Sequence, residues 1–443
     1  MRHGRHSLSF SVHRPKNAGR MYHVRSCGFL LGYAPQPDVG GQMYLPSRRI
    51  ITNNMSFRKF RAPQLFNGYA LLQNNQVLIT KADGTIEAIS AAEDAGDDIL
   101  ELEGIITPGL INCHCHIELS HLKNVIPPHT GLVAFLCSVV TKRGFDPELV
   151  QEEIAKAEQE MYDNGTVAVG DICNTADAVR VKSNSRMRWQ SFIEVLSFTD
   201  ARAAENMAHY ENVLQAHRQA LPAPHRNVLT PHAPYSISAR TFELLNAATS
   251  GSIISIHNQE HPAEDELYKT GGGGFLQLFN IFGVTESPFP VTGKSSLQSY
   301  LPHFTNGQTI FLIHNTYMPQ EDMVFANAYA KEKKLRLVYC LCPNANLYIE
   351  NKLPPIERLM ANGCHMVLGT DSYSSNWQLS IAKEIQVIHH HFPSLELATI
   401  LQWATSNGAK ALQWDNELGS FEKGKKPGVT LLANDLGSSR RII

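Results

Sequence analysis

Residues 105–122 read IITPGLINCHCHIELSHL, and the fold and the chemistry of the chain are organised around this stretch. Two short apolar runs, separated by Pro108 and Gly109, lead to His114 and His116. Residues two apart on a strand point to the same side, so both imidazoles can face one point. Two histidines that fall close together by chance would look the same, because the chain has 20 of them. The metal-site interpretation therefore depends on the following strands.

Predicted strands alternate with predicted helices from this stretch onward. The stretch supplies the first strand, and seven more are predicted at residues 166–173, 190–198, 227–230, 252–257, 309–314, 336–341 and 366–370. Helices are predicted at residues 147–164, 201–219, 320–333, 382–390 and 395–412. Parallel strands need crossover connections, so this α/β pattern favours a (β/α)8 TIM barrel over residues 105–414. A long loop is expected at residues 260–302, with a mobile glycine run at 271–274.

The segments before and after the predicted barrel have the sequence pattern of β-strands. Residues 65–102 contain short apolar runs and the turn signal Asp83-Gly84, and residues 429–432 are again apolar. We therefore expect residues 55–104 and 415–443 to form one small composite β-sandwich.

The first 54 residues differ from everything that follows. They are rich in arginine, hold a single acidic residue, Asp38, and show neither helical nor strand periodicity. Such a composition suits an organellar transit peptide, or a basic extension that precedes a functional start at Met55. We favour the second interpretation and expect this segment to be poorly ordered.

The overall composition is that of an ordinary globular protein, with 43% hydrophobic and 18% charged residues. A formal net charge of −2 gives no global attraction to nucleic acid or to a membrane surface. No apolar run approaches the ~20 residues of a membrane helix. The CxC pairs at 113/115 and 340/342 lack the CxxC spacing of zinc ribbons. We expect reduced cysteines and a cytoplasmic protein without nucleic-acid or membrane partners.

Polar residues gather at the ends of the predicted strands. Five strand ends carry histidine or aspartate, namely His114 with His116, His232, His257, His314 and Asp371. The C-terminal ends of barrel strands form the rim on which barrel active sites are built. Packing would explain one such histidine but not five such strand ends. The sequence therefore predicts a metal centre at this rim.

The donor types indicate which metal and which chemistry. Three imidazoles and a carboxylate suit one divalent ion, zinc or else iron, with a position left for water. The predicted ligands are His114, His116, His257 and Asp371. Such an ion lowers the pKa of bound water from about 15.7 to roughly 7. Glu260, three residues after His257, is the expected general acid and base, and His314 is expected to assist the hydroxide or stabilise developing charge.

Six motifs in this order closely resemble those of the amidohydrolase superfamily, in particular its cytosine-deaminase-related branch. They are PGLINCHCHIELS (108–120), TPHAPYSIS (230–238), SIHNQE (255–260), LIHNT (312–316), LCPNANLYI (341–349) and LGTDSYSSNWQLS (368–380). The resemblance covers residue 65 to the C-terminus. It implies the same four metal ligands, a proton shuttle at Glu260, assistance from His314, and an Asp371 that takes a proton from the attacking water. A second metal bridged by a modified lysine is not expected, because His232 stands where that lysine would lie.

Two of these motifs look most like those of aminodeoxyfutalosine deaminases and chlorohydrolase-like relatives. By that resemblance Glu118 lies near the substrate, with a structural salt bridge as the alternative. His121 and His232 are further candidates for substrate contacts. Family members often form homodimers or larger assemblies, so a homo-oligomer is also possible on this resemblance.

The favoured hypothesis is hydrolytic deamination of an amino-substituted purine- or pyrimidine-like heterocycle or nucleoside. In this hypothesis the small-molecule substrate and water are the only partners that the chemistry requires. Hydrolysis of another C–N bond or of a C–Cl bond on the same site is the alternative. A non-catalytic scaffold is disfavoured, because such proteins typically lose metal ligands and this chain retains all of them.

Overall fold

The computed structural model describes residues 57–72 and 74–443, which belong to one compact unit. The basic segment predicted at residues 1–54 lies outside the described residues, so neither interpretation of it is tested by the structure. Helices and strands alternate along the described chain, which confirms the α/β class. Within the described residues, no helix combines the length and the apolarity that crossing a membrane requires.

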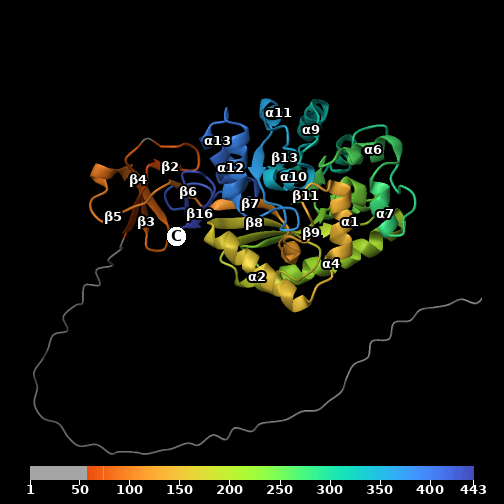
Figure 1. Cartoon of the computed structure of the whole chain (residues 1–443), viewed down its shortest axis with the longest axis horizontal. Helices are drawn as coiled ribbons and strands as arrows, with labels where there is room; N and C mark the ends of the chain where they lie inside the picture. The colour runs from red at the N-terminus through yellow and green to blue at the C-terminus, as the bar shows by residue number, and fades with distance from the viewer. Residues whose placement is uncertain (1–56, 73) are drawn as a thin grey trace, which may run out of the picture. The chain divides into compact units, whose positions relative to one another are not determined.

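Two four-stranded parallel sheets form the centre of the structure (Figure 1). The strands of the first, in spatial order, are β10 (Arg226–Pro231), β9 (Arg188–Val195), β8 (Thr166–Cys173) and β7 (Leu110–Cys115). The strands of the second are β11 (Ile253–Asn258), β12 (Thr309–His314), β13 (Arg336–Leu341) and β14 (Met366–Leu368). β8, β12 and β13 have the bounds that the sequence predicts. Most residues of these strands are buried, as expected of parallel strands covered by helices.

Backbone contacts join the two sheets at both of their edges. At one edge, Cys115 and Asp371 form a parallel bridge, and the Asp371 N–H donates to the His114 carbonyl at 3.0 Å. At the other edge, the His257 N–H on β11 donates to the His232 carbonyl at 2.9 Å. Because the strands share one direction, their C-terminal ends lie on one rim, where the predicted site residues also lie.

Helices connect the strands, and α2 and α4 lie outside the first sheet (Figure 1). The helices are α1 (Leu132–Lys142), α2 (Pro147–Asp163), α3 (Val179–Asn184), α4 (Ala203–Ala220), α5 (Ala239–Ala248), α6 (Pro262–Thr270), α7 (Phe275–Ile281), α8 (Ser296–Tyr300), α9 (Gln320–Lys333), α10 (Pro343–Glu350), α11 (Ile356–Ala361), α12 (Ile381–His391), α13 (Leu397–Ala404) and α14 (Ser406–Ala411).

The start and end of α2 show how local sequence sets these bounds. Pro147 occupies the first turn, and the Asp146 carboxylate accepts the Glu148 N–H at 2.8 Å, which satisfies a free donor of the helix end. The chain leaves the helix at Asn164 and Gly165, and Gly165 has a φ of +85° that favours glycine.

The helix predicted at residues 395–412 is interrupted, which corrects the sequence prediction. Thr405 lies outside helical geometry, with φ −135° and ψ −91°, and its hydroxyl donates to the Leu401 carbonyl at 2.6 Å. The second half, α14, then packs so closely on β7 that a Cβ on Gly408 would lie 2.9 Å from Ile111 Cβ. A straight helix could not make this approach.

The prediction of a long loop at residues 260–302 is also wrong, because α6, α7 and α8 lie within this segment. His261 begins α6 by accepting the Ala263 N–H at 3.0 Å, and Glu264 accepts the His261 N–H at 3.3 Å. Gly271, with φ +75°, ends the helix. The three helices have at most nine residues each, which is too short for a clear periodicity.

Two further four-stranded sheets are present. The first takes its strands only from residues 57–101, and the second combines strands from both ends of the described chain. One contains β4 (Ile86–Ala91), β3 (Gln76–Lys81), β1 (Phe57–Arg61) and β5 (Ile99–Glu101). The other contains β16 (Ser439–Arg441), β15 (Val429–Leu432), β6 (Ile105–Pro108) and β2 (Gln64–Leu65). Gly109 separates β6 from β7. The chain passes so close to Val167 at this point that a Cβ on Gly109 would lie 2.2 Å from Val167 Cγ1.

Candidate active site

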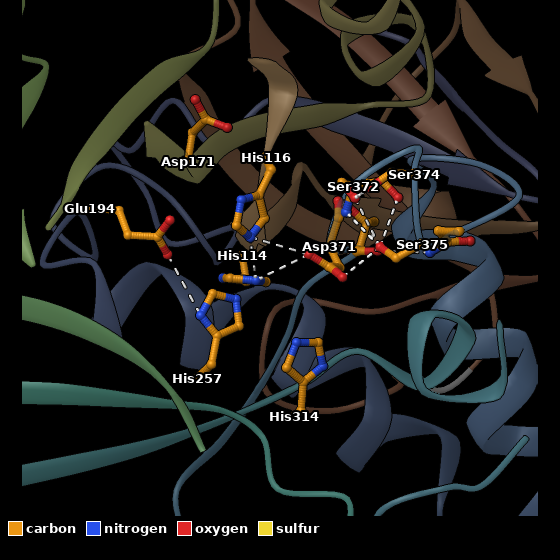
Figure 2. Close-up of polar contacts among 12 residues, drawn as sticks. His114, His116, Asp171, Glu194, His257, His314, Asp371, Ser372, Ser374 and Ser375 are labelled. Carbon is orange, nitrogen blue, oxygen red and sulfur yellow. Dashed lines mark hydrogen bonds and ion pairs between the residues drawn. The ribbon is translucent and has the colours of Figure 1, made fainter. Parts of the chain in front are cut away.

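The two histidines of the opening stretch lie at the end of β7. His114 is fully buried, and His116 follows immediately before the short 3-10 helix Ile117–Leu122. Their Nε2 atoms are 3.2 Å apart, and the rings are nearly perpendicular. The predicted convergence of the two imidazoles is thus present in the geometry (Figure 2).

Asp371 faces these histidines from the end of β14. Its Oδ1 lies 3.3 Å from the Nε2 atoms of both His114 and His116. The chain can approach because Gly369 has no side chain: a Cβ there would lie 2.7 Å from His114 Cβ. Asp371 has a φ of +58°, an uncommon backbone conformation that the surrounding contacts must hold.

His257, at the end of β11, has its tautomer set by the backbone. Its Nδ1 donates to the His232 carbonyl at 2.9 Å. The proton of the neutral ring is therefore on Nδ1, and the Nε2 lone pair is free for a metal.

His314, at the end of β12, has the opposite arrangement. The Asn346 amide Nδ2 donates to His314 Nδ1 at 3.1 Å and to the Thr316 hydroxyl at 2.7 Å. The proton of the neutral His314 ring is therefore on Nε2, which makes Nε2 a donor. Its φ of +70° places His314 in the same uncommon backbone region as Asp371.

Glu260 points its carboxyl at His314, with Oε1 3.6 Å from His314 Nε2. Its backbone N–H donates to the Glu264 carboxylate at 2.7 Å, so Glu264 holds the segment that carries it. Burial, reinforced by the charge of Asp371, raises the pKa of Glu260 well above its ordinary value. This shift favours the protonated form of the carboxyl.

Burial also fixes the charge of the other groups. It lowers the pKa values of four imidazoles, so that they are neutral and can offer lone pairs: His114, His116, His257 and His314. Burial opposes ionisation of Asp371, but the imidazoles of His116 and His314 and the hydroxyl of Ser375 hold its pKa below its ordinary value. One carboxylate thus faces several neutral imidazoles.

The donor set fits a divalent cation. Ligand atoms of His114, His257, His314 and Asp371 lie within 4.8 Å of one another, and His116 Nε2 adjoins the group. Neutral imidazoles whose ring nitrogens face one another at 3.2 Å can share only one proton. A cation at the centre would satisfy these lone pairs, and nitrogen and oxygen donors suit zinc and related ions.

The cluster lies at the inner end of a cavity of about 580 Å³. Its polar end is lined by His116, His232, His257, Glu260, His314 and Asp371. Its apolar wall includes Leu132, Phe135, Leu136 and Val139 of α1 and Leu278 of α7. The cavity thus suits a ligand with a polar reacting end and an apolar surface.

A model of the amidohydrolase family matches residues 105–439. The chain belongs to the amidohydrolase family. The resemblance drawn from the six motifs is thereby confirmed.

Relatives of this amidohydrolase include several deaminases. An adenosine deaminase of Helicobacter pylori is 27% identical over 332 residues, which is 74% of this chain and 78% of that protein. The crystal structure of H. pylori aminofutalosine deaminase with methylthio-coformycin has a TM-score of 0.73 at 24% identity, covering 85% of this chain and 92% of that chain. An adenosine deaminase from Xanthomonas campestris with bound zinc has a TM-score of 0.64 at 20% identity, covering 84% of each chain.

The three predicted substrate residues of this amidohydrolase lie in different places. His232 lines the cavity, and its Nδ1 is 2.7 Å from the Ser236 hydroxyl. Glu118 and His121 do not line the cavity that the described residues form. Glu118 Oε2 instead accepts the backbone N–H groups of Asn174 and Thr175, at 2.9 and 3.1 Å. These contacts favour the structural alternative for Glu118.

Sequence reasoning missed residues that support the side chains of the cluster in this amidohydrolase. Asn346 and Ser375 hold His314 and Asp371, and both lie inside the recognised motifs, which was the available signal. A buried pair, Asp171 and Lys182, was also missed. Asp171 Oδ1 accepts the N–H of Ile117, the residue after His116, at 2.8 Å, and Oδ2 lies 2.5 Å from Lys182 Nζ.

Proposed function

We propose that this amidohydrolase is a metal-dependent hydrolytic deaminase of an amino-substituted purine- or pyrimidine-like heterocycle or nucleoside. The observation that carries the proposal is the floor of the cavity, where the buried carboxyl of Glu260 lies beside His314 and the convergent donors. Deamination needs a proton donor next to an activated water; the Glu260 carboxyl suits the first role, and the donor set suits a cation that would activate the water. The adenosine deaminase name of an H. pylori relative supports the same reaction.

We further propose that the cavity floor binds a single zinc ion through His114, His116, His257 and Asp371. The bound zinc in the X. campestris relative supports this choice over iron. When bound, the ion acts as a Lewis acid that makes water nucleophilic at neutral pH.

The chain's own residues then have distinct roles. Asp371 takes the proton of the water that attacks the amine-bearing carbon. Glu260 gives its proton to the adjacent ring nitrogen. It then takes the remaining proton of the attacking hydroxyl and gives it to the departing amino group, which leaves as ammonia, and the proton held by Asp371 returns to Glu260. His314 donates from Nε2 to the attacking oxygen, the role that its Asn346 contact prepares.

The proposed architecture is a closed (β/α)8 barrel over residues 105–414, with residues 55–104 and 415–443 as a composite β-sandwich. The contacts at both edges of the parallel sheets support closure. The four-stranded sheets that combine β1 with β5 and β6 with β15 support the second domain. We also propose a cytoplasmic location, because the seven described cysteines are free thiols.

The test is ammonia release by zinc-loaded protein from a panel of aminopurines, aminopyrimidines and their nucleosides. Glu260→Gln is expected to lose at least about 100-fold in kcat while keeping its zinc, because general acid–base catalysis contributes this much. Glu266→Gln is the matched control, since Glu266 is an exposed residue of α6. Full activity of Glu260→Gln would refute the mechanism, and release of chloride from a chloropurine probe, with no ammonia from the panel, would favour the alternative reaction.

A further inference from the structure

Glu194, at the end of β9, is a buried carboxyl with one free oxygen. It is 3% exposed and lines the cavity. The Asn174 amide donates to its Oε2 at 3.0 Å. Its Oε1 is buried and has no hydrogen-bond partner among the described residues. A buried polar atom without a partner is costly, so such an atom in a ligand cavity indicates a missing ligand group.

The nearest protein donor cannot satisfy this oxygen. His257 Nδ1 lies 3.6 Å from Glu194 Oε1, but its proton goes to the His232 carbonyl at 2.9 Å. In Figure 2, Glu194 lies on the side of His257 away from Asp371. The free oxygen therefore lies against His257, at the edge of the metal-binding cluster.

The chemistry of a nucleoside-like substrate limits which group can donate to Oε1. The amine must lie at the metal-binding cluster and near Glu260, because the carbon that bears it is attacked there. The ring nitrogens of an N-substituted aminopurine carry no protons. The remaining donors of the substrate are the hydroxyl groups of its sugar.

We propose that Glu194 is a specificity residue whose Oε1 accepts a hydrogen bond from a sugar hydroxyl of the substrate. This inference rests on the proposed deaminase function and narrows its substrate to hydroxyl-bearing nucleosides. Asn174 is the positioning residue, because its amide fixes Oε2 and leaves Oε1 directed to the ligand.

A second metal ion is the competing occupant, since ligand atoms of Glu194, His232 and His257 lie within 4.8 Å of one another. Such an ion would need the Nδ1 lone pair of His257, and that nitrogen carries the proton donated to the His232 carbonyl. The hydroxyl of a ligand leaves that proton in place.

The experiment compares zinc-loaded wild type, Glu194→Ala and Glu194→Gln with paired probes. Calorimetric Kd values are measured for inosine and 2′,3′-dideoxyinosine, and kcat/KM for adenosine and 2′,3′-dideoxyadenosine. Wild type is expected to favour the hydroxylated member by about 2- to 10-fold, the usual effect of one hydrogen bond. Glu194→Ala should bring each pair close to equality. Thr199→Val, a cavity-wall change without an acidic group, should keep the wild-type ratio.

Zinc content and the thermal midpoint verify that each variant is folded. A ratio that Glu194→Ala leaves unchanged would overturn the role of Glu194. A second zinc per wild-type chain that this variant loses would also overturn it. If wild type neither binds nor deaminates any nucleoside, the proposed function itself fails; binding without a hydroxyl-dependent ratio refutes the Glu194 inference alone.

Discussion

Ser375 donates its hydroxyl to Asp371 Oδ2 at 2.5 Å, while Oδ1 of the same carboxylate lies 3.3 Å from two histidine Nε2 atoms. The two oxygens of Asp371 are thus divided between a supporting contact and the cluster (Figure 2). Such a division sets the orientation of the carboxylate, because rotation about its last bond would break the Ser375 contact.

Ser375→Ala is expected to lower zinc affinity or kcat by about 10- to 100-fold, the usual cost of losing a residue that orients a ligand. Zinc titration and ammonia release measure the two effects. Ser374→Ala is the matched control, because Ser374 bonds Ser372 in the same turn. Equal losses in both variants would show that the turn, and not the contact to Asp371, matters.

Asn346→Asp should reverse the proton arrangement of His314. A carboxylate facing Nδ1 draws the proton to that nitrogen, so a neutral ring would no longer donate from Nε2. We expect kcat to fall by about 10- to 100-fold with zinc content preserved. Thr316→Val, which removes only the other partner of the amide, should cost less. Parallel loss of zinc and activity in Asn346→Asp would instead make His314 a ligand.

Gly369→Ala should disturb the cluster by displacing His114. The added Cβ would lie 2.7 Å from His114 Cβ and 2.9 Å from its backbone nitrogen, so β7 or β14 must move. Overpacking of this kind costs about 1–3 kcal/mol. Metal analysis and the thermal midpoint should both show a loss. Gly144→Ala, where an added Cβ meets nothing within 4 Å, is the control; equal behaviour of the two variants would contradict the close packing.

Glu384 should make stability depend on pH. Burial raises its pKa to about 8, although the Asn344 N–H and the Asn376 amide donate to it. The unfolded chain, with a pKa near ~4.3, binds fewer protons over the interval between the two values. The contribution of Glu384 to the free energy of unfolding is therefore greatest at low pH. It falls as pH rises toward 8, by at most about 1.4 kcal/mol per pH unit.

Glu384→Gln removes this titration, so thermal midpoints measured from pH 5 to 9 should fall less steeply than those of wild type. The stability gap between wild type and variant should narrow as pH rises. Curves that stay parallel across this range would show that Glu384 has an ordinary pKa in the folded protein.

Sequence alone predicted the parallel strands well, because most of them are buried apolar runs. β12 and β13 have their predicted bounds for this reason. The same pattern placed His114, His257 and Asp371 on one rim, since parallel strands share a direction. Their assignment as metal ligands stays a prediction.

The remaining features depend on distances that no local pattern encodes. Asn346 and His314 are neighbours only because β13 lies beside β12. The break at Thr405 follows from the approach of α14 to β7, which sequence periodicity does not reveal. The free oxygen of Glu194 is visible only when every nearby donor has been assigned.

The pairing of β6 with β15 has a consequence for biosynthesis. Ile105 pairs with Leu432, and only Gly109 separates β6 from the strand that ends near His114. At ~5–20 residues per second, a ribosome makes β15 on the order of tens of seconds after β6. Until then, β6, which leads directly into the histidine strand, lacks its antiparallel partner. We therefore expect metal uptake to be a late event in the maturation of the chain.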